Sequence, residues 1–301
     1  MNRKGRGSPW SAYQTRALRR LAPLLMLALN PLAMAETSLW EVSRDGHSLF
    51  LGGTIHVLRA ADYPLPQAYQ RAFTDADLIV FETDLRATQE RAFQQTLLRT
   101  TRYPDGETLA DHLSPEALSA LQQHCRQHGI PLDALLPFKP AWTMLTLLSI
   151  ELKRLGIAAT GVDHHYMQQA LQANKPVAGL ESAAEQLSFI TGLGVGNESA
   201  LILHTLDELQ QIDALLDQMV QMWRHGDIDA MDEVFVTPMA TDYPAIYRTV
   251  LVERNNAWLP QIEHHLRHQD STLVLVGAAH LAGEQGLLAQ LKSKGYRIRQ
   301  W

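Results

Sequence analysis

Two apolar runs near opposite ends of the chain each stop at a glycine and reach a histidine three residues later. The first run stops at Gly53 and reaches His56, and the second stops at Gly277 and reaches His280. A short apolar run bounded by polar residues is typical of a strand buried on both faces of a parallel sheet. Because the same pattern occurs twice, far apart in the sequence, we expect the two imidazoles to serve one shared site.

Two further apolar runs end in a carboxylate. Residues 78–81 precede Glu82, and residues 175–180 precede Glu181. In an open α/β sheet, functional sites form outside the carboxyl ends of the strands. If the four strands run parallel, their terminal histidines and glutamates converge at one edge of the sheet.

The order of apolar runs and helical segments along the chain predicts an α/β fold. We expect a central, mostly parallel sheet, with an N-terminal hairpin that turns at Asp45-Gly46. Residues of about 88–174 and 183–268 carry apolar positions at helical spacing and are predicted to form a large helical insert.

Residues 1–35 have the composition of a secretory signal peptide. They carry six basic and no acidic residues, a short apolar core at 21–29, and the small-x-small sequence Ala33-Met34-Ala35. We expect cleavage before Glu36, a mature domain of residues 36–301 and a periplasmic or secreted location; a buried helix or an uncleaved anchor is the alternative. No later stretch reaches the ~18 uninterrupted apolar residues of a membrane helix, so we expect no membrane span after cleavage.

The charge balance argues against nucleic acid as a partner. The whole chain has 26 basic and 32 acidic residues, and removing the six basic residues of the leader leaves a net charge of −12. Such an acidic protein repels phosphate backbones.

Cys125 is the only cysteine, so the chain cannot form an internal disulfide. We expect the hydrophobic core to hold the mature protein together, and a bound metal could add to its stability.

The histidines and glutamates together suit a divalent transition metal. Two imidazoles and one or two carboxylates are a common donor set that leaves a position open for water. Alternatives remain for each residue. Each histidine could be a polar loop residue, Glu82 and Glu181 could cap the helices that follow them, and Arg254 could be solvated on its helix.

The chain resembles the TraB/GumN family, which includes the Tiki metalloproteases and is distantly similar to erythromycin-esterase and ChaN-like proteins. The resemblance covers nearly the whole mature chain. It rests on short segments, in order: Leu39-Trp40, Gly52-Gly53-Thr54-Ile55-His56, Phe81-Glu82, Gly161-Val162-Asp163, Gly179-Leu180-Glu181, Glu253-Arg254-Asn255 and Val276-Gly277-Ala278-Ala279-His280. It implies an α/β core with a helical insert and a metal-dependent hydrolase site, with manganese or cobalt as in Tiki-type members.

On this basis we predict a periplasmic, metal-dependent hydrolase that is peptidase-like and acts on a peptide or small molecule. His56, His280 and Glu82 are expected to surround the metal, which could be manganese, cobalt or zinc. Glu181 is expected to be a supporting carboxylate or general base. Arg254 is expected to stabilise oxyanion charge or orient a carboxylate, and Asn255 is expected to donate a hydrogen bond.

Two other functions remain open. The same histidines could bind haem or iron, or the protein could bind a peptide without cleaving it. The chain could also be a scaffold that has lost its metal and only contacts partners. Oligomeric state does not follow from the sequence.

Overall fold

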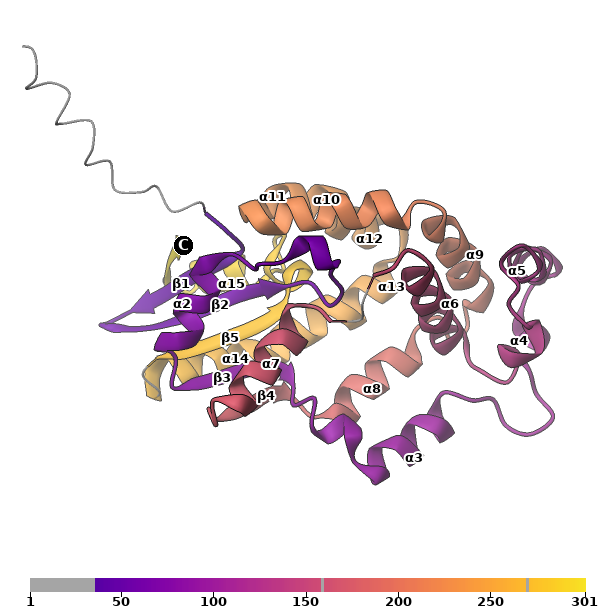
Figure 1. Cartoon of the computed structure of the whole chain (residues 1–301), viewed down its shortest axis with the longest axis horizontal. Coiled ribbons are helices and arrows are strands. Elements are labelled where there is room, and N and C mark those ends of the chain that lie inside the picture. The colour runs from indigo at the N-terminus through magenta and orange to yellow at the C-terminus, as the bar shows by residue number, and fades with distance from the viewer. Residues whose placement is uncertain (1–35, 158–159, 269–270) are drawn as a thin grey trace, which may run out of the picture. The chain divides into compact units, whose positions relative to one another are not determined.

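A computed structural model of the chain describes residues 36–157, 160–268 and 271–301. The predicted signal peptide lies outside these residues. The fold is built on a six-stranded sheet with the strand order β4-β3-β5-β2-β1-β6 (Figure 1). The strands are β1 (Leu39–Arg44), β2 (His47–Thr54), β3 (Leu78–Thr83), β4 (Val177–Glu181), β5 (Thr272–Gly277) and β6 (Arg297–Gln300).

The strand directions confirm the predicted mixed α/β class. Neighbouring pairs among β4, β3, β5 and β2 are parallel, whereas β1 pairs antiparallel with both β2 and β6. The hairpin of β1 and β2 turns at Asp45 and Gly46, which have φ of 52° and 86°. Since β2, β5 and β3 are adjacent and parallel, their carboxyl ends lie at the same edge.

Most of the remaining chain is helical. The segments expected to be helical contain most of the helices, which Figure 1 labels. The helices are α2 (Gln67–Asp75), α3 (Arg91–Thr100), α4 (Leu109–His112), α5 (Pro115–His128), α6 (Pro140–Arg154), α7 (Val162–Gln172), α8 (Ala183–Gly192), α9 (Glu198–Leu209), α10 (Ile212–His225), α11 (Ile228–Met231), α12 (Thr237–Asp242), α13 (Pro244–Tyr247), α14 (Glu253–His268) and α15 (Leu287–Ser293). Within the part of the chain that the structure describes, no helix is long and apolar enough to cross a bilayer.

Both faces of the sheet are covered, which explains why the central strands are continuously apolar. Alternate residues of β5 point to opposite faces, and all six of its residues are buried. Leu273 and Leu275 pack in one cluster with α2, α7 and α10, whereas Val274 and Val276 pack in another with α14 and α15.

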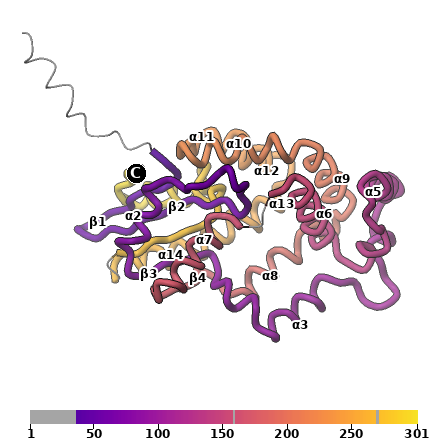
Figure 2. Tube along the Cα trace, in the orientation of Figure 1, coloured from indigo at the N-terminus to yellow at the C-terminus, as the bar shows by residue number. Residues whose placement is uncertain are grey.

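A third apolar cluster lies within the helical part of the chain. It joins α5, α6 and α9, which lie together away from the sheet in Figure 2. Cys125 is a buried free thiol in this cluster. The helical part therefore has a hydrophobic core of its own, and not all of its apolar side chains are buried against the sheet.

Helix α10 is fixed to the carboxyl end of β2 by a buried hydrogen bond. Trp223 is fully buried and its Nε1 donates to the carbonyl of Gly53 at 2.7 Å. The hydroxyl of Tyr69 donates to the same carbonyl. These contacts hold the strand directly before the Gly53–His56 turn.

Replacing Trp223 by phenylalanine removes this donor and leaves a small cavity. We expect Trp223→Phe to lower the free energy of unfolding by about 1–3 kcal/mol. Urea denaturation measures this as a lower midpoint at unchanged slope. The control is Trp301→Phe, at a half-buried C-terminal residue whose ring contacts Phe50. Equal midpoints for the two variants would contradict the role assigned to Trp223.

Candidate functional site

His56, Glu82 and His280 converge in front of Gly277. A methyl group in place of a Gly277 hydrogen would lie 3.2 Å from Oε1 of Glu82 and 3.6 Å from both Cδ2 of His280 and Nε2 of His56. The parallel register of β2 and β5 aligns Thr54 with Gly277, so the two Gly-x-x-His turns leave the sheet side by side. The glycine at 277 thus keeps open a space that two imidazoles and a carboxylate share.

His280 is buried and held by Asn255. Its Nδ1 lies 2.7 Å from Oδ1 of Asn255, whose amide Nδ2 donates to the carbonyls of His280 and Gln285 at 3.2 and 2.9 Å. With the amide oriented in this way, Nδ1 carries the proton, and the lone pair of Nε2 accepts from Nη1 of Arg254 at 3.2 Å. Burial lowers the pKa of His280, so its imidazole is neutral near pH 7.

His56 is held by Asp163 in a corresponding way. Its Nδ1 lies 2.8 Å from Oδ2 of Asp163, and Oδ1 of the same carboxylate accepts a hydrogen bond from the Thr54 hydroxyl at 2.7 Å. The negative charge of Asp163 raises the pKa of His56 to about 9. The His56 side chain is 66% exposed, in contrast to the buried His280. Its remaining nitrogen, Nε2, faces the space in front of Gly277.

Gly161 lets the first turn of α7 reach His56. A Cβ at this position would lie 2.1 Å from the carbonyl oxygen of Ile55 and 2.2 Å from the carbonyl carbon of His56. The next residue, Val162, donates its N–H to the Ile55 carbonyl at 2.9 Å. The close approach of the two backbones brings Asp163 within reach of the imidazole, which gives a physical reason for the Gly-Val-Asp sequence.

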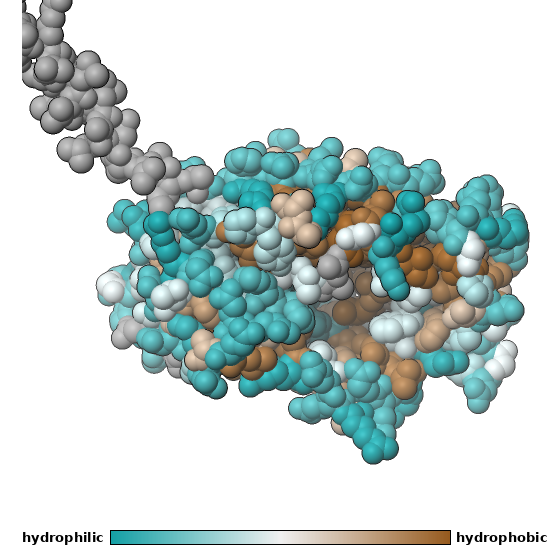
Figure 3. Space-filling model, in the orientation of Figure 1, coloured by the Kyte–Doolittle hydropathy of each residue, from teal (hydrophilic) through white to brown (hydrophobic). Residues whose placement is uncertain are grey.

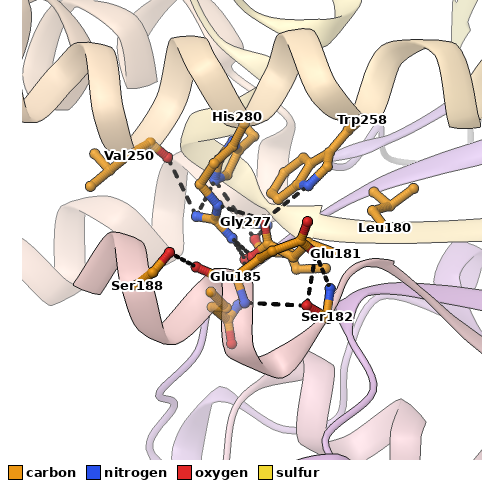
Figure 4. A network of polar contacts seen from close by, with 12 residues as sticks. Leu180, Glu181, Ser182, Glu185, Ser188, Val250, Trp258, Gly277 and His280 are labelled. Carbon is orange, nitrogen blue, oxygen red and sulfur yellow. Dashed lines mark hydrogen bonds and ion pairs between the residues drawn. The ribbon is translucent and has the colours of Figure 1, made fainter. Parts of the chain in front are cut away.

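Arg254 joins the two carboxylates. Its Nη2 donates to Glu82 at 2.6 Å and to Glu181 at 2.7 Å, and its Nε donates to Glu181 at 3.1 Å. Figure 4 shows Glu181, Trp258 and His280 gathered around this network. The guanidinium carbon lies 4.5 Å from the centre of the Trp258 ring, and Nε1 of Trp258 donates to Glu181 at 3.1 Å.

The network fixes the charges of the site. Burial alone would raise the pKa of Glu82, but the charges of Arg254 and His56 and the amide of Gly277, which donates at 2.7 Å, lower it. Burial raises the pKa of Glu181 against the opposing effect of Arg254. Glu82 is ionised and His280 is neutral near pH 7, so the groups that face the open space include a carboxylate that attracts a cation.

The predicted residues take different places around this space. His56, His280 and Glu82 face it, whereas Glu181 binds Arg254 through both of its oxygens. Asn255 supports His280 through its side-chain oxygen, and its amide donates to two backbone carbonyls.

Asp163 stood out in the sequence only as part of Gly161-Val162-Asp163, and Thr54 and Trp258 were not predicted to belong to the site. Asp163 is a hydrogen-bond partner of Thr54 and His56, whereas Gly161 is the cap of α7. Thr54 stands inside the first Gly-x-x-His pattern, and Trp258 stands one helical turn after Arg254. Their positions relative to these motifs could have indicated a role.

A divalent metal fits the donor chemistry of this site, although the donors do not form a closed cage. Among residues 36–157, 160–268 and 271–301, no group of three or more His, Cys, Asp or Glu is arranged to hold a metal. Nη1 of Arg254 lies 3.2 Å from Nε2 of His280, which is 3.8 Å from Oε1 of Glu82. Each imidazole nevertheless has its Nδ1 held by an oxygen acceptor, as in metal-ligating histidines, and Nε2 of His56 faces the shared space.

Comparisons with known proteins agree with the sequence resemblance. Residues 38–300 match the model of the TraB/PrgY/gumN family. An uncharacterized protein YbaP of Escherichia coli (strain K12) is 28% identical over 255 residues, covering 84% of this chain and 91% of YbaP. The metalloprotease TIKI2 of Xenopus tropicalis is 22% identical, covering 86% of this chain and 59% of TIKI2. No solved structure matches the chain.

Removing the guanidinium would leave two buried carboxylates without their partner. We expect Arg254→Met to lower the free energy of unfolding by about 3–5 kcal/mol, because an uncompensated buried charge is costly. Denaturant unfolding of the purified protein measures this effect.

The control is Arg299→Met. Arg299 makes an ion pair with Glu41 at 2.6 Å, but its side chain is 57% exposed. We expect a loss of about 1 kcal/mol or less for this exposed pair. An Arg254→Met variant no less stable than Arg299→Met would refute the clamping role of Arg254.

Proposed function

This chain belongs to the TraB/PrgY/gumN family, and we propose that it is a metal-dependent hydrolase with peptidase-like chemistry. One observation carries the proposal. The imidazoles of His56 and His280 each have Nδ1 held by an oxygen acceptor, and together with the buried carboxylate of Glu82 they face the space in front of Gly277. This is the arrangement that orients histidines as metal ligands.

We assign His56, His280 and Glu82 as the residues that hold the metal. Imidazole and carboxylate donors suit manganese, cobalt or zinc, and His56, whose pKa is raised to about 9, must lose its proton when a metal binds. A bound cation of this kind supplies a Lewis acid that polarises a carbonyl and lowers the pKa of water. Binding of a metal at Nε2 of His280 would replace the 3.2 Å contact of that nitrogen with Nη1 of Arg254.

The surrounding residues orient these groups and handle charge. Asp163 positions His56, and Asn255 positions His280. Arg254 is held through two hydrogen bonds by Glu181, so its Nη1 can donate to an oxygen that gains negative charge during hydrolysis. Oε1 of Glu82 lies 3.8 Å from Nε2 of His280 and faces the same space as both imidazoles, so this carboxylate can accept a proton from the attacking water. Glu181 thus supports Arg254 rather than the reacting atoms.

The substrate and location rest on other observations. TIKI2, a distant relative, is named a metalloprotease, which supports a peptide substrate. The composition of residues 1–35 supports export to the periplasm. A net charge of −12 after the leader is removed supports substrates other than nucleic acids.

Loss of His280 tests the metal site directly. We expect the wild-type protein to retain roughly one manganese, cobalt or zinc ion per chain, and His280→Ala to lose most of it together with peptide cleavage. Elemental analysis and digestion of a peptide mixture, with and without chelator, measure both. The control is His264→Ala, an exposed histidine on the same helix as Arg254.

Two results would reject the hydrolase proposal. The first is unchanged metal content and cleavage in His280→Ala. The second is a colourless metal-free wild type that gains a Soret absorbance with added haem and loses it in His56→Ala, which would favour the haem-binding alternative.

Loss of the carboxylate behind His56 tests the positioning role. We expect Asp163→Asn to weaken metal affinity by roughly 10–100-fold, the usual effect of removing such a partner. Competition titration against a metal-chelating dye measures the affinity. Asp213→Asn is the control, since Asp213 pairs with Arg59 at 2.6 Å and its side chain is 64% exposed. Equal affinities of Asp163→Asn and wild type would show that His56 does not depend on Asp163.

A further inference from the structure

An apolar pocket of about 550 Å³ lies between α8, the following loop and the segment around α13. Its apolar lining includes Phe189, Leu193, Val195, Tyr243 and Ile246. Figure 3 shows a hollow with a hydrophobic surface in the region where Figure 1 has α8 and α13. Its volume is in the range of pockets that bind small ligands or single side chains of a larger ligand.

The exposure of Val195 indicates that the rest of the chain does not cover this part of the pocket wall. Val195 is 60% exposed, the most exposed large apolar side chain among the described residues. The loop that presents it has glycines on either side, and Gly194 and Gly196 have φ of 75° and 81°. A Cβ at Gly194 would lie 2.5 Å from Cδ2 of Leu201, so the glycine allows the loop to lie against α9. The backbone therefore fixes an apolar residue at the pocket surface.

Both walls of the pocket are continuous with the candidate site. On one side, α8 begins two residues after Glu181, and its Phe189 ring lies 6.0 Å from the guanidinium carbon of Arg254. On the other side, Thr249 lines the pocket within the π-helical turn Arg248–Val252, which leads directly into α14. The carbonyl of Val250 in that turn lies 3.4 Å from Nη1 of Arg254.

The spacing along both walls places the pocket close to Glu181 and Arg254. Phe189 stands eight residues after Glu181, and Thr249 stands five residues before Arg254. At about 1.5 Å per helical residue, these separations correspond to about 12 and 8 Å. An extended peptide covers this length in two to four residues, at about 3.3 Å each.

We infer that this pocket binds an apolar side chain, aromatic or large aliphatic, of a peptide whose bond is hydrolysed at the His56–His280 site. The inference rests on the proposed function and names its substrate class. The residue in the pocket lies a few positions from the cleaved bond.

The rim of the pocket favours a peptide over a plain acyl chain. Polar side chains stand among the apolar ones, including Ser188, Asn197, Asp242 and Thr249. A peptide offers amide groups that these side chains can bind while one apolar side chain is buried, whereas an acyl chain offers none along its length.

Photo-crosslinking tests the inference without requiring turnover. The probe is the pentapeptide acetyl-Ala-Ala-X-Ala-Ala-amide, with p-benzoylphenylalanine at X. Irradiation of the purified protein with the probe, followed by peptide mapping, is expected to locate the crosslinks in residues 188–201 and 242–249. Ala200 is exposed on α9 and lines the pocket, so Ala200→Trp fills it. We expect about tenfold less crosslinking in this variant, the minimum for losing burial of a large apolar side chain.

Two control variants separate the effect of filling the pocket from other effects of the substitution. Ala200→Ser changes the same position without filling the pocket, and Ser119→Trp adds the same side chain at an exposed position of α5. Both are expected to crosslink like wild type. Undiminished crosslinking in Ala200→Trp, or crosslinks elsewhere such as at exposed Leu98 on α3, would overturn the inference. So would a pocket labelled by a photoreactive fatty acid but not by the peptide.

A parallel digestion distinguishes this inference from the proposed function. Metal-dependent cleavage of peptides together with crosslinks outside the pocket would retain the hydrolase and reject the pocket assignment. Crosslinks in the pocket that Ala200→Trp abolishes, in a protein with neither metal nor cleavage, would retain peptide binding and reject the hydrolase.

Discussion

The positive charge of Arg254 makes the rest of the site possible. Two glutamates end neighbouring parallel strands and are buried within one network, and each would be costly to bury alone. The guanidinium binds both of them and stacks on Trp258, so a single cation compensates two carboxylates. Arg254 also contacts His280, so the same side chain connects the two buried carboxylates to the imidazole that faces the open space in front of Gly277.

Two different parts of the chain orient the two imidazoles in the same way. His56 is held by an acidic residue from the first turn of α7, and His280 by an amide from the first turn of α14. Their environments differ, because His56 is exposed and His280 is buried. A negatively charged partner suits the exposed imidazole, whereas a neutral partner leaves the buried imidazole uncharged and avoids burying an ion.

The helical insert does more than cover the sheet. It has its own apolar cluster between α5, α6 and α9, and two of its elements extend directly from site residues. The helix after Glu181 and the π-helical turn before Arg254 both line the apolar pocket. Single π-helical turns within longer helices are frequent at functional sites. The insert therefore connects the polar edge of the sheet to an apolar surface.

The sequence alone determined the strands, their carboxyl-end residues and the fold class, because apolar runs and turn glycines are local signals. The hairpin turn at Asp45-Gly46 and the parallel central strands were predictable for this reason. Only the tertiary structure decided that Glu181 binds Arg254, that Asn255 orients His280, and that Trp258 completes the network. Glu181 and His280 lie outside the helix that carries Arg254, Asn255 and Trp258, and local periodicity contains no information about which segments meet. Gly161 likewise lies close to His56 because two backbone segments pack together. No pattern in a single sequence indicates which segments do so.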